Sequence, residues 1–209
     1  MRAVKWYMIL GVGLLLGCQP VSYQLEIPDY LQWVKEDDHS WRQTKEVGDY
    51  RVEVLLHPPE YQLLQEYAGA VMSAVTWDSI TQVPPTYQYA TLRIGSADEQ
   101  TPLLRKNTED AFSYQARVQY LAFELQQALT LRSDSSNNPC VLYHFERSFD
   151  LAPFVTCMIA FPAPVDAESD WTIRWEDNHF GMGPLQFRFP ASRNAQQPTV
   201  KIPAHASAI

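Results

Sequence analysis

Glycine is scarce in this chain, and the scarcity excludes several nucleotide-binding motifs. Only eight of the 209 residues are glycine, and Gly11, Gly13 and Gly17 are three of them, near the N-terminus. Phosphate-binding loops of the Walker and dinucleotide types need glycines at a fixed spacing that does not occur here. The Gly-x-Ser-x-Gly turn of α/β-hydrolases is also missing. The sequence therefore contains no motif for nucleotide binding or serine hydrolysis.

Positive charge is in deficit as well. The chain has 16 Lys and Arg against 24 Asp and Glu, a net charge of −8, and no basic cluster. Neutralising phosphates provides most of the affinity that proteins have for nucleic acids, so we expect no nucleic-acid partner. The acidic residues are dispersed, which is typical of a solvated surface.

No apolar run reaches the ~20 residues that a membrane-spanning helix needs. Arg2 and Lys5 precede an apolar core over Tyr7–Leu16. A basic start followed by such a short core is typical of a secretory signal peptide. Such a segment can be an ordinary secretory signal, an uncleaved anchor or the signal peptide of a lipoprotein.

The residues that end the apolar core, 15–18, read Leu-Leu-Gly-Cys and resemble the lipobox of bacterial lipoproteins. The resemblance implies that residues 1–17 are a signal peptide, cut before Cys18, and that acyl chains then anchor Cys18 in the bilayer. Two or more acyl chains anchor a protein stably, at ~0.8 kcal/mol per buried methylene. Removing Arg2 and Lys5 with the signal would change the net charge from −8 to −10.

The residues after the cysteine indicate a destination. Gln19 stands where the inner-membrane retention signal of enterobacterial lipoproteins has Asp, which favours the outer membrane. Surface-exposed lipoproteins of Bacteroidetes often carry an acidic cluster directly after the cysteine, and here the first acid is Glu26. We therefore expect the periplasmic leaflet rather than the cell surface.

Cysteine is rare too, and two residues remain once Cys18 is assigned to lipid. Cys140 and Cys157 form the obvious disulfide candidate in an oxidising periplasm. A simple hairpin around residues 148–154 would place Cys157 near His144 and Cys140 near Phe161, out of reach of each other. The alternative to a bridge is a pair of buried thiols.

The pattern of apolar residues predicts one α+β domain over residues 28–203, after a tether (18–27) and before a flexible tail (204–209). We expect mainly antiparallel strands, either as a β-sandwich-like arrangement or as a sheet with two to three helices. The expected helices are Asp29–Glu36, Glu60–Val75 and Asp110–Gln127, the last with a rival reading as strands. The expected strands are Trp41–Val47, Tyr50–Leu56, Tyr87–Ile94, Cys140–Arg147, Phe154–Phe161, Trp171–Glu176 and Leu185–Phe189.

The order of these segments also resembles a known group. Residues 143–153 read Tyr-His-Phe-Glu-Arg-Ser-Phe-Asp-Leu-Ala-Pro, and a later turn, 180–187, reads Phe-Gly-Met-Gly-Pro-Leu-Gln-Phe. Together they resemble uncharacterised outer-membrane lipoproteins of Bacteroidetes, over about residues 28–203. The resemblance implies no catalytic motif.

Acidic and histidine side chains provide the candidates for chemistry. His144 and Glu146 are two apart on one strand, and Asp177 and His179 are two apart beside a glycine turn, so four groups would suit zinc if the two elements met. The spacing matches no known zinc signature, and ordinary strand residues are the alternative. Carboxylates that could serve glycoside hydrolysis stand at expected strand ends: Glu146, Asp150, Glu176 and Asp177. We expect no metal and no cofactor.

Aromatic residues provide the candidates for binding. Trp171 and Trp175 point to the same face of their strand and would form a platform for sugars or a protein if exposed, or core if buried. Phe180 and Met182 form an apolar turn that would contact a partner unless it folds over the core. We expect a non-catalytic accessory or assembly subunit that binds an outer-membrane protein, the alternative being a glycan-binding or carbohydrate-processing lipoprotein with an aromatic face.

Overall fold

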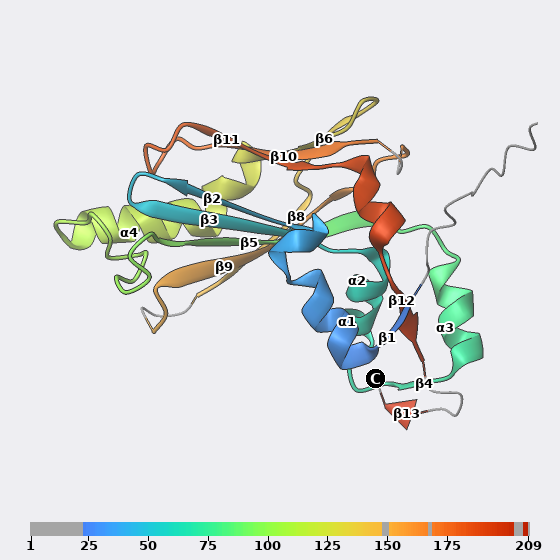
Figure 1. Ribbon diagram of the computed structural model, residues 1–209. Helices are drawn as coiled ribbons and strands as arrows, with labels where there is room; N and C mark the ends of the chain where they lie inside the picture. Colours follow the sequence, from blue (N-terminus) through green and yellow to red (C-terminus); the bar gives the residue numbers. More distant parts are fainter. Residues whose placement is uncertain (1–22, 148–150, 167–168, 203–206, 209) are drawn as a thin grey trace, which may run out of the picture.

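The protein has an α+β fold built mainly from two antiparallel sheets, as the sequence predicts. The computed structural model describes residues 23–147, 151–166, 169–202 and 207–208. Figure 1 shows the smaller sheet lying over the larger one, with helices α1 (Ile27–Val34), α2 (Pro59–Glu66) and α3 (Ala74–Thr81) gathered beyond one end of the strands. We call this group of helices, together with the two small two-stranded sheets beside it, the helical end.

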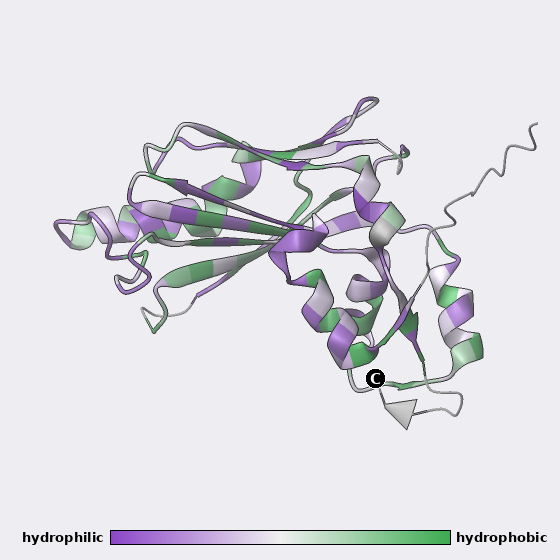
Figure 2. Ribbon diagram, in the orientation of Figure 1, coloured by the Kyte–Doolittle hydropathy of each residue, from purple (hydrophilic) through white to green (hydrophobic). Residues whose placement is uncertain are grey.

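The larger sheet has five antiparallel strands in the order β2-β3-β5-β9-β8. Their bounds are β2 (Arg42–Val47), β3 (Tyr50–Leu56), β5 (Tyr87–Ser96), β8 (Leu142–Glu146) and β9 (Phe154–Pro162). Arg51 and Glu53 separate Tyr50, Val52 and Val54, and these three residues and Leu56 are buried, so one face of β3 lies in the core. Figure 2 shows this alternation along the strand. Period-two hydrophobicity made these strands predictable.

The smaller sheet has the order β11-β10-β6-β7 and packs its apolar face on the larger one. Its strands are β6 (Leu129–Arg132), β7 (Asn137–Pro139), β10 (Trp171–Glu176) and β11 (Pro184–Phe189). The inward residues of β10 and β11 pair in register across the sheet. All six are buried: Trp171, Ile173, Trp175, Leu185, Phe187 and Phe189. A sandwich core of this kind removes most of their apolar surface from water.

Arg193, in the short 3₁₀ helix η4 (Ala191–Gln196), fastens one edge of the sandwich. Its guanidinium carbon lies 4.1 Å from the ring centroid of Trp171 and 5.6 Å from that of Trp41, which precedes β2. Nη1 donates to the carbonyl oxygens of Phe189 and Pro190, at 3.2 and 3.0 Å. The side chain therefore ties both sheets to the turn after β11.

The helical segment expected over Asp110–Gln127 is present. It runs as α4 (Ala111–Gln119), a π-helical turn η2 (Tyr120–Glu124) and a 3₁₀ turn η3 (Leu125–Ala128). The carboxylate of Asp110 accepts a hydrogen bond from the backbone N–H of Ser113 at 2.7 Å, which caps the first turn. The rival interpretation placed strands around Phe112–Ala116 and Ala128–Arg132, and it was right only about the second, because β6 (Leu129–Arg132) begins directly after this helix.

The prediction of one long helix over Glu60–Val75 is wrong. Two shorter helices replace it, α2 (Pro59–Glu66) and α3 (Ala74–Thr81), with β4 (Val71–Met72) between them. Gly69 has a φ of +81°, which a helix cannot contain, and the Ser73 hydroxyl accepts from the Thr76 N–H to start α3. The prediction failed because the apolar periodicity of the sequence continues through Gly69, where the first helix has ended, and through Ser73, which caps the second.

The helical end also corrects the expected domain limits. Part of the expected tether forms β1 (Gln24–Glu26), which pairs in parallel with β12 (Thr199–Lys201), and α1 spans Ile27–Val34. Part of the expected flexible tail forms β13 (Ser207–Ala208), which pairs with β4. A 3₁₀ turn η1 (Asp37–His39) follows α1. No helix among the described residues is both long and apolar enough to span a membrane.

Candidate functional site

The two tryptophans expected to form a binding platform are in the core. Trp171 and Trp175 do share one face, as predicted, but they are 7% and 0% exposed. The indole N–H of Trp175 donates to the Tyr120 hydroxyl at 3.2 Å, and that of Trp171 donates to the Asp166 carbonyl oxygen at 3.2 Å. Of the two alternatives, core is the one observed, and neither ring can stack on a sugar.

The Phe180 turn is folded over the core and does not project as a contact site. Phe180 is 9% exposed, and its ring packs edge-on against Tyr50 and Trp175, at centroid distances of 5.2 and 6.0 Å. The buried carboxylate of Asp177 accepts from the backbone N–H groups of His179, Phe180 and Met182, at 3.0, 2.9 and 2.7 Å. Met182 is half-buried in the same loop. Asp177 therefore holds the turn against the sandwich.

The four residues considered for zinc do not meet. His144 and Glu146 are exposed on β8 of the larger sheet, whereas Asp177 and His179 belong to the loop that follows β10 of the smaller sheet. No group of three or more His, Cys, Asp or Glu side chains in the described part of the chain could hold a metal ion. His144 and Glu146 share one strand as expected, but the tertiary structure separates them from Asp177 and His179.

The acids considered for glycoside hydrolysis also have other roles where they are described. Asp177 holds its loop, and Glu176 forms an ion pair with Arg174. Glu146 lies exposed on the larger sheet, apart from both. Asp150 lies outside the described residues. The three described acids form no facing carboxylate pair.

The two cysteines that the structure describes are free thiols and are poor nucleophiles. Cys140 and Cys157 are both buried and unbridged, so the disulfide is absent. In the observed register Cys157 pairs with Phe145, one residue from the position expected. Burial raises the pKa of Cys157 to about 12 and that of Cys140 to about 11, so both thiols are protonated at neutral pH.

Two hollows lie at opposite ends of the outer face of the larger sheet, the face that turns away from the smaller sheet. Strand pairing places Glu53, Arg93 and Thr156 in one row across this face, and His144, Met158 and Thr91 in another. The first hollow lies near the ends of β3 and β5 that are far from the helical end, and the second lies against α2 and α3.

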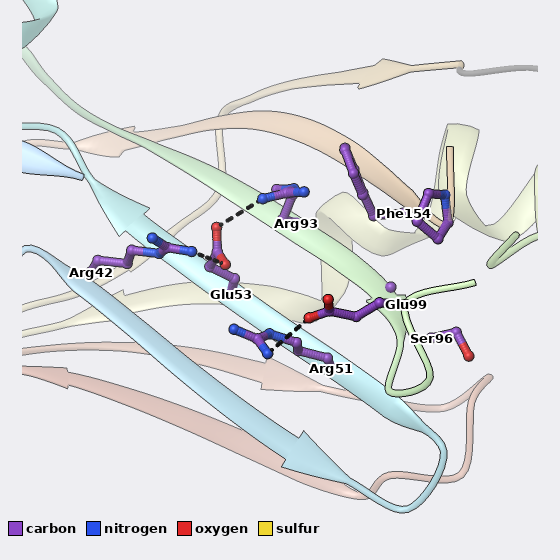
Figure 3. A pocket seen from close by; sticks show the side chains of 9 residues that line it. Arg42, Arg51, Glu53, Arg93, Ser96, Glu99 and Phe154 are labelled. Atoms are coloured by element: carbon purple, nitrogen blue, oxygen red, sulfur yellow. Dashed lines mark hydrogen bonds and ion pairs between the residues drawn. The ribbon is translucent and has the colours of Figure 1, made fainter. Parts of the chain in front are cut away.

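The first hollow, the arginine pocket, has a volume of about 310 Å³. Its charged residues are Arg42, Arg51, Glu53, Arg93 and Glu99 (Figure 3). Arg42 and Arg93 both face the carboxylate of Glu53, and Arg51 donates to Glu99 at 3.0 Å. The Arg93 guanidinium also lies 3.6 Å from the ring centroid of Phe154. Every guanidinium here already faces a carboxylate, so the pocket's charges are largely paired internally.

The second hollow, which we call the tyrosine cleft, is larger, at about 570 Å³. Its walls come from α2, from the end of α3, and from the start of β5 with the loop before it. Its main apolar residues are Leu63, Tyr67, Ile80, Val83, Pro84, Pro85, Tyr87 and Tyr89. The volume and the largely apolar and aromatic lining are typical of ligand sites.

Buried polar groups hold the floor of the tyrosine cleft in place. Gln88 is 4% exposed, and its amide nitrogen donates to the carbonyl oxygens of His57 and Tyr89, at 2.7 and 2.9 Å. The imidazole of His57 is 3.0 Å from the Gln62 carbonyl oxygen through Nδ1 and 2.9 Å from the Thr91 hydroxyl through Nε2. Burial lowers the pKa of His57 to about 4, so the ring is neutral at physiological pH.

The charges around the tyrosine cleft are of one sign. Glu60 and Glu66, both on α2, line it, and no lysine or arginine of the described chain does. Gln197 donates to the Glu60 carboxylate, which fixes that side chain beside α1. Glu66 is exposed at the rim. The cleft therefore combines apolar walls with an unbalanced negative charge.

Another hollow, of about 330 Å³, lies where the π-helical turn meets the loop after β10. The rings of Tyr120 and His179 stack there at a centroid distance of 4.6 Å. Burial, and then the nearby charge of Arg117, lower the pKa of His179. The stacked faces cover each other, so this hollow offers a ligand little aromatic surface.

Searches of protein-family models, of curated protein sequences and of solved structures find no match to this chain. The choice of a candidate site therefore rests on geometry alone, and on geometry the tyrosine cleft is the strongest candidate. Sequence reasoning missed it, because its walls come from two separate segments, within residues 57–67 and 80–89, that only the fold brings together. One usable signal was present: Pro84-Pro85 followed by Tyr87 and Tyr89, which alternate onto one face of β5.

Proposed function

We propose that this protein is an outer-membrane lipoprotein, anchored by an acylated Cys18, that binds a membrane protein as a non-catalytic accessory subunit. The anchor rests on the resemblance of residues 15–18 to a lipobox, and the destination rests on Gln19. Cys18 itself lies outside the described residues. The periplasmic leaflet is part of the same proposal.

One observation carries the binding role: the tyrosine cleft is part of the end of the molecule that would lie near the membrane. β1 begins at Gln24, six residues after Cys18, and six extended residues span at most about 20 Å. β1 pairs with β12 at the helical end, beside the helices that form the cleft (Figure 1). A partner embedded in the same membrane is therefore within reach of the cleft.

The chemistry of the described residues supports a binding role over a catalytic one. His57 is neutral and both its ring nitrogens are engaged, and both described thiols are protonated. We do not propose glycan binding through Trp171 and Trp175, since both are buried.

Photocrosslinking in intact cells tests this function. A benzophenone amino acid replaces Tyr87 in the cleft, and a matched control carries it at Phe112, which is 82% exposed on α4 at the far end of the molecule. We expect a single membrane protein to crosslink from position 87 and not from position 112. Equal labelling from both positions, or none from 87, contradicts a partner bound at the cleft.

The anchor has its own test. Cys18→Ala should move the protein from the membrane fraction to the soluble fraction, and it should also abolish the crosslink from position 87. Persistence of Cys18→Ala in the membrane fraction would defeat the lipid anchor and leave the cleft to be judged by crosslinking alone.

A further inference from the structure

We infer that the tyrosine cleft binds an extended, basic and apolar segment of the partner protein. This inference rests on the proposed function and adds the chemistry of the ligand. The tyrosine rings and aliphatic side chains can bury apolar residues, and flat aromatic faces with prolines nearby are a recurrent way to hold extended peptides.

The walls of the tyrosine cleft are stiff, which favours peptide binding. Pro59 begins α2 on one side, and Pro84-Pro85 enters β5 on the other. Each proline has a restricted backbone, and the buried Gln88 ties the strand to the chain at His57. Less conformational entropy is then lost when a flexible segment binds to a surface that is already ordered.

The negative charge of the cleft favours a positively charged ligand. Glu60 and Glu66 are the ionised groups that line the tyrosine cleft in the described part of the chain, and no cation balances them there. A lysine or arginine in the bound segment would complement them, whereas an acidic segment would meet like charge. The same carboxylates disfavour fatty acids and anionic lipids.

The openness of the surface argues for a segment and against a small enclosed ligand. Val83 and Tyr87, on the rim, are 69% and 45% exposed. An acyl chain or small hydrophobe would leave these side chains in water, but an extended peptide can cover them as it crosses the cleft. In the proposed function the helical end lies toward the bilayer, where a loop or terminus of a membrane protein emerges.

The test uses a displayed library of random twelve-residue peptides, selected against the mature acylated protein in nanodiscs. Enriched peptides are then measured on the wild type, on Glu66→Lys and on Glu109→Lys. Glu109 is an exposed glutamate just before α4, so the control changes the net charge equally at the opposite end.

We expect enriched peptides to contain lysine or arginine among apolar residues. Their affinity should fall about tenfold on Glu66→Lys and stay within about twofold on Glu109→Lys. Enrichment of peptides without basic residues, equal losses on both variants, or no enrichment would overturn the inference. If the inference is overturned but position 87 still crosslinks to a membrane protein in cells, the proposed function stands. If position 87 gives no crosslink, the proposed function is contradicted, whatever the peptides show.

Discussion

Acidification should destabilise this protein through His57 at the floor of the tyrosine cleft. The imidazole is 4% exposed, packs edge-on against Tyr61 at 4.9 Å, and has Gln62 and Thr91 on its two nitrogens. Burial lowers its pKa from 6.5 to about 4. The folded state therefore keeps His57 neutral at a pH where the unfolded chain has already bound a proton.

The direction and the size of the change in stability follow from this difference in pKa between the folded and the unfolded state. Above pH 6.5 both states are neutral at His57, so it contributes no pH dependence. Between pH 6.5 and 4 only the unfolded state is protonated, and the free energy of unfolding falls by about 1.4 kcal/mol per pH unit. The loss is about 2 kcal/mol at pH 5 and about 3 kcal/mol at pH 4. Asp98, whose pKa is lowered by backbone hydrogen bonds, loses its contribution only at more acidic pH.

The assay is urea unfolding, followed by tryptophan fluorescence at several pH values between 4.5 and 7.5. His57→Gln is the matched control, because a neutral amide cannot take up a proton in this range. We expect the wild type to lose about 2 kcal/mol more than His57→Gln between pH 7 and pH 5. Equal pH slopes for the two proteins would refute the assignment of this loss to His57.

Two further substitutions probe the core. Trp175→Ala should lower the free energy of unfolding by about 3 to 5 kcal/mol, because it removes a fully buried indole and its bond to Tyr120, and urea unfolding measures the loss. A change below about half a kcal/mol would mean that the indole is exposed. Arg193→Met should cost about 3 kcal/mol, because the carbonyl oxygens of Phe189 and Pro190 lose a buried donor and Trp171 loses its stacked guanidinium. A melting temperature within about 1 °C of the wild type would contradict that role for Arg193.

Local patterns predicted the strands well. β10 alternates apolar and polar residues throughout and β3 does so as far as Val54, and both strands have the expected limits. The hairpin of β2 and β3 was predictable because Gly48, at a φ of +57°, allows a tight turn between two alternating runs. Strand period and turn chemistry depend on near neighbours in the chain, which the sequence displays directly.

Helix limits and the binding surface were less predictable. Apolar residues continued at helical spacing through Gly69, so only the backbone conformation of that glycine revealed two helices in place of one. The Phe180 turn was apolar and glycine-rich, yet three hydrogen bonds to Asp177 fold it inward. An aromatic residue near a turn has the same local pattern whether it faces solvent or core.

The sequence by itself determined the class of the fold, because several alternating runs with a few helical segments between them favour antiparallel sheets with helices. It also showed that Trp171 and Trp175 share a face, since side chains alternate along any strand. Only the tertiary structure decided that this face is buried and that Leu63, Ile80 and Tyr87 converge on one cleft. Burial and convergence depend on which layer packs on which face, and that choice is made by contacts between residues far apart in the chain.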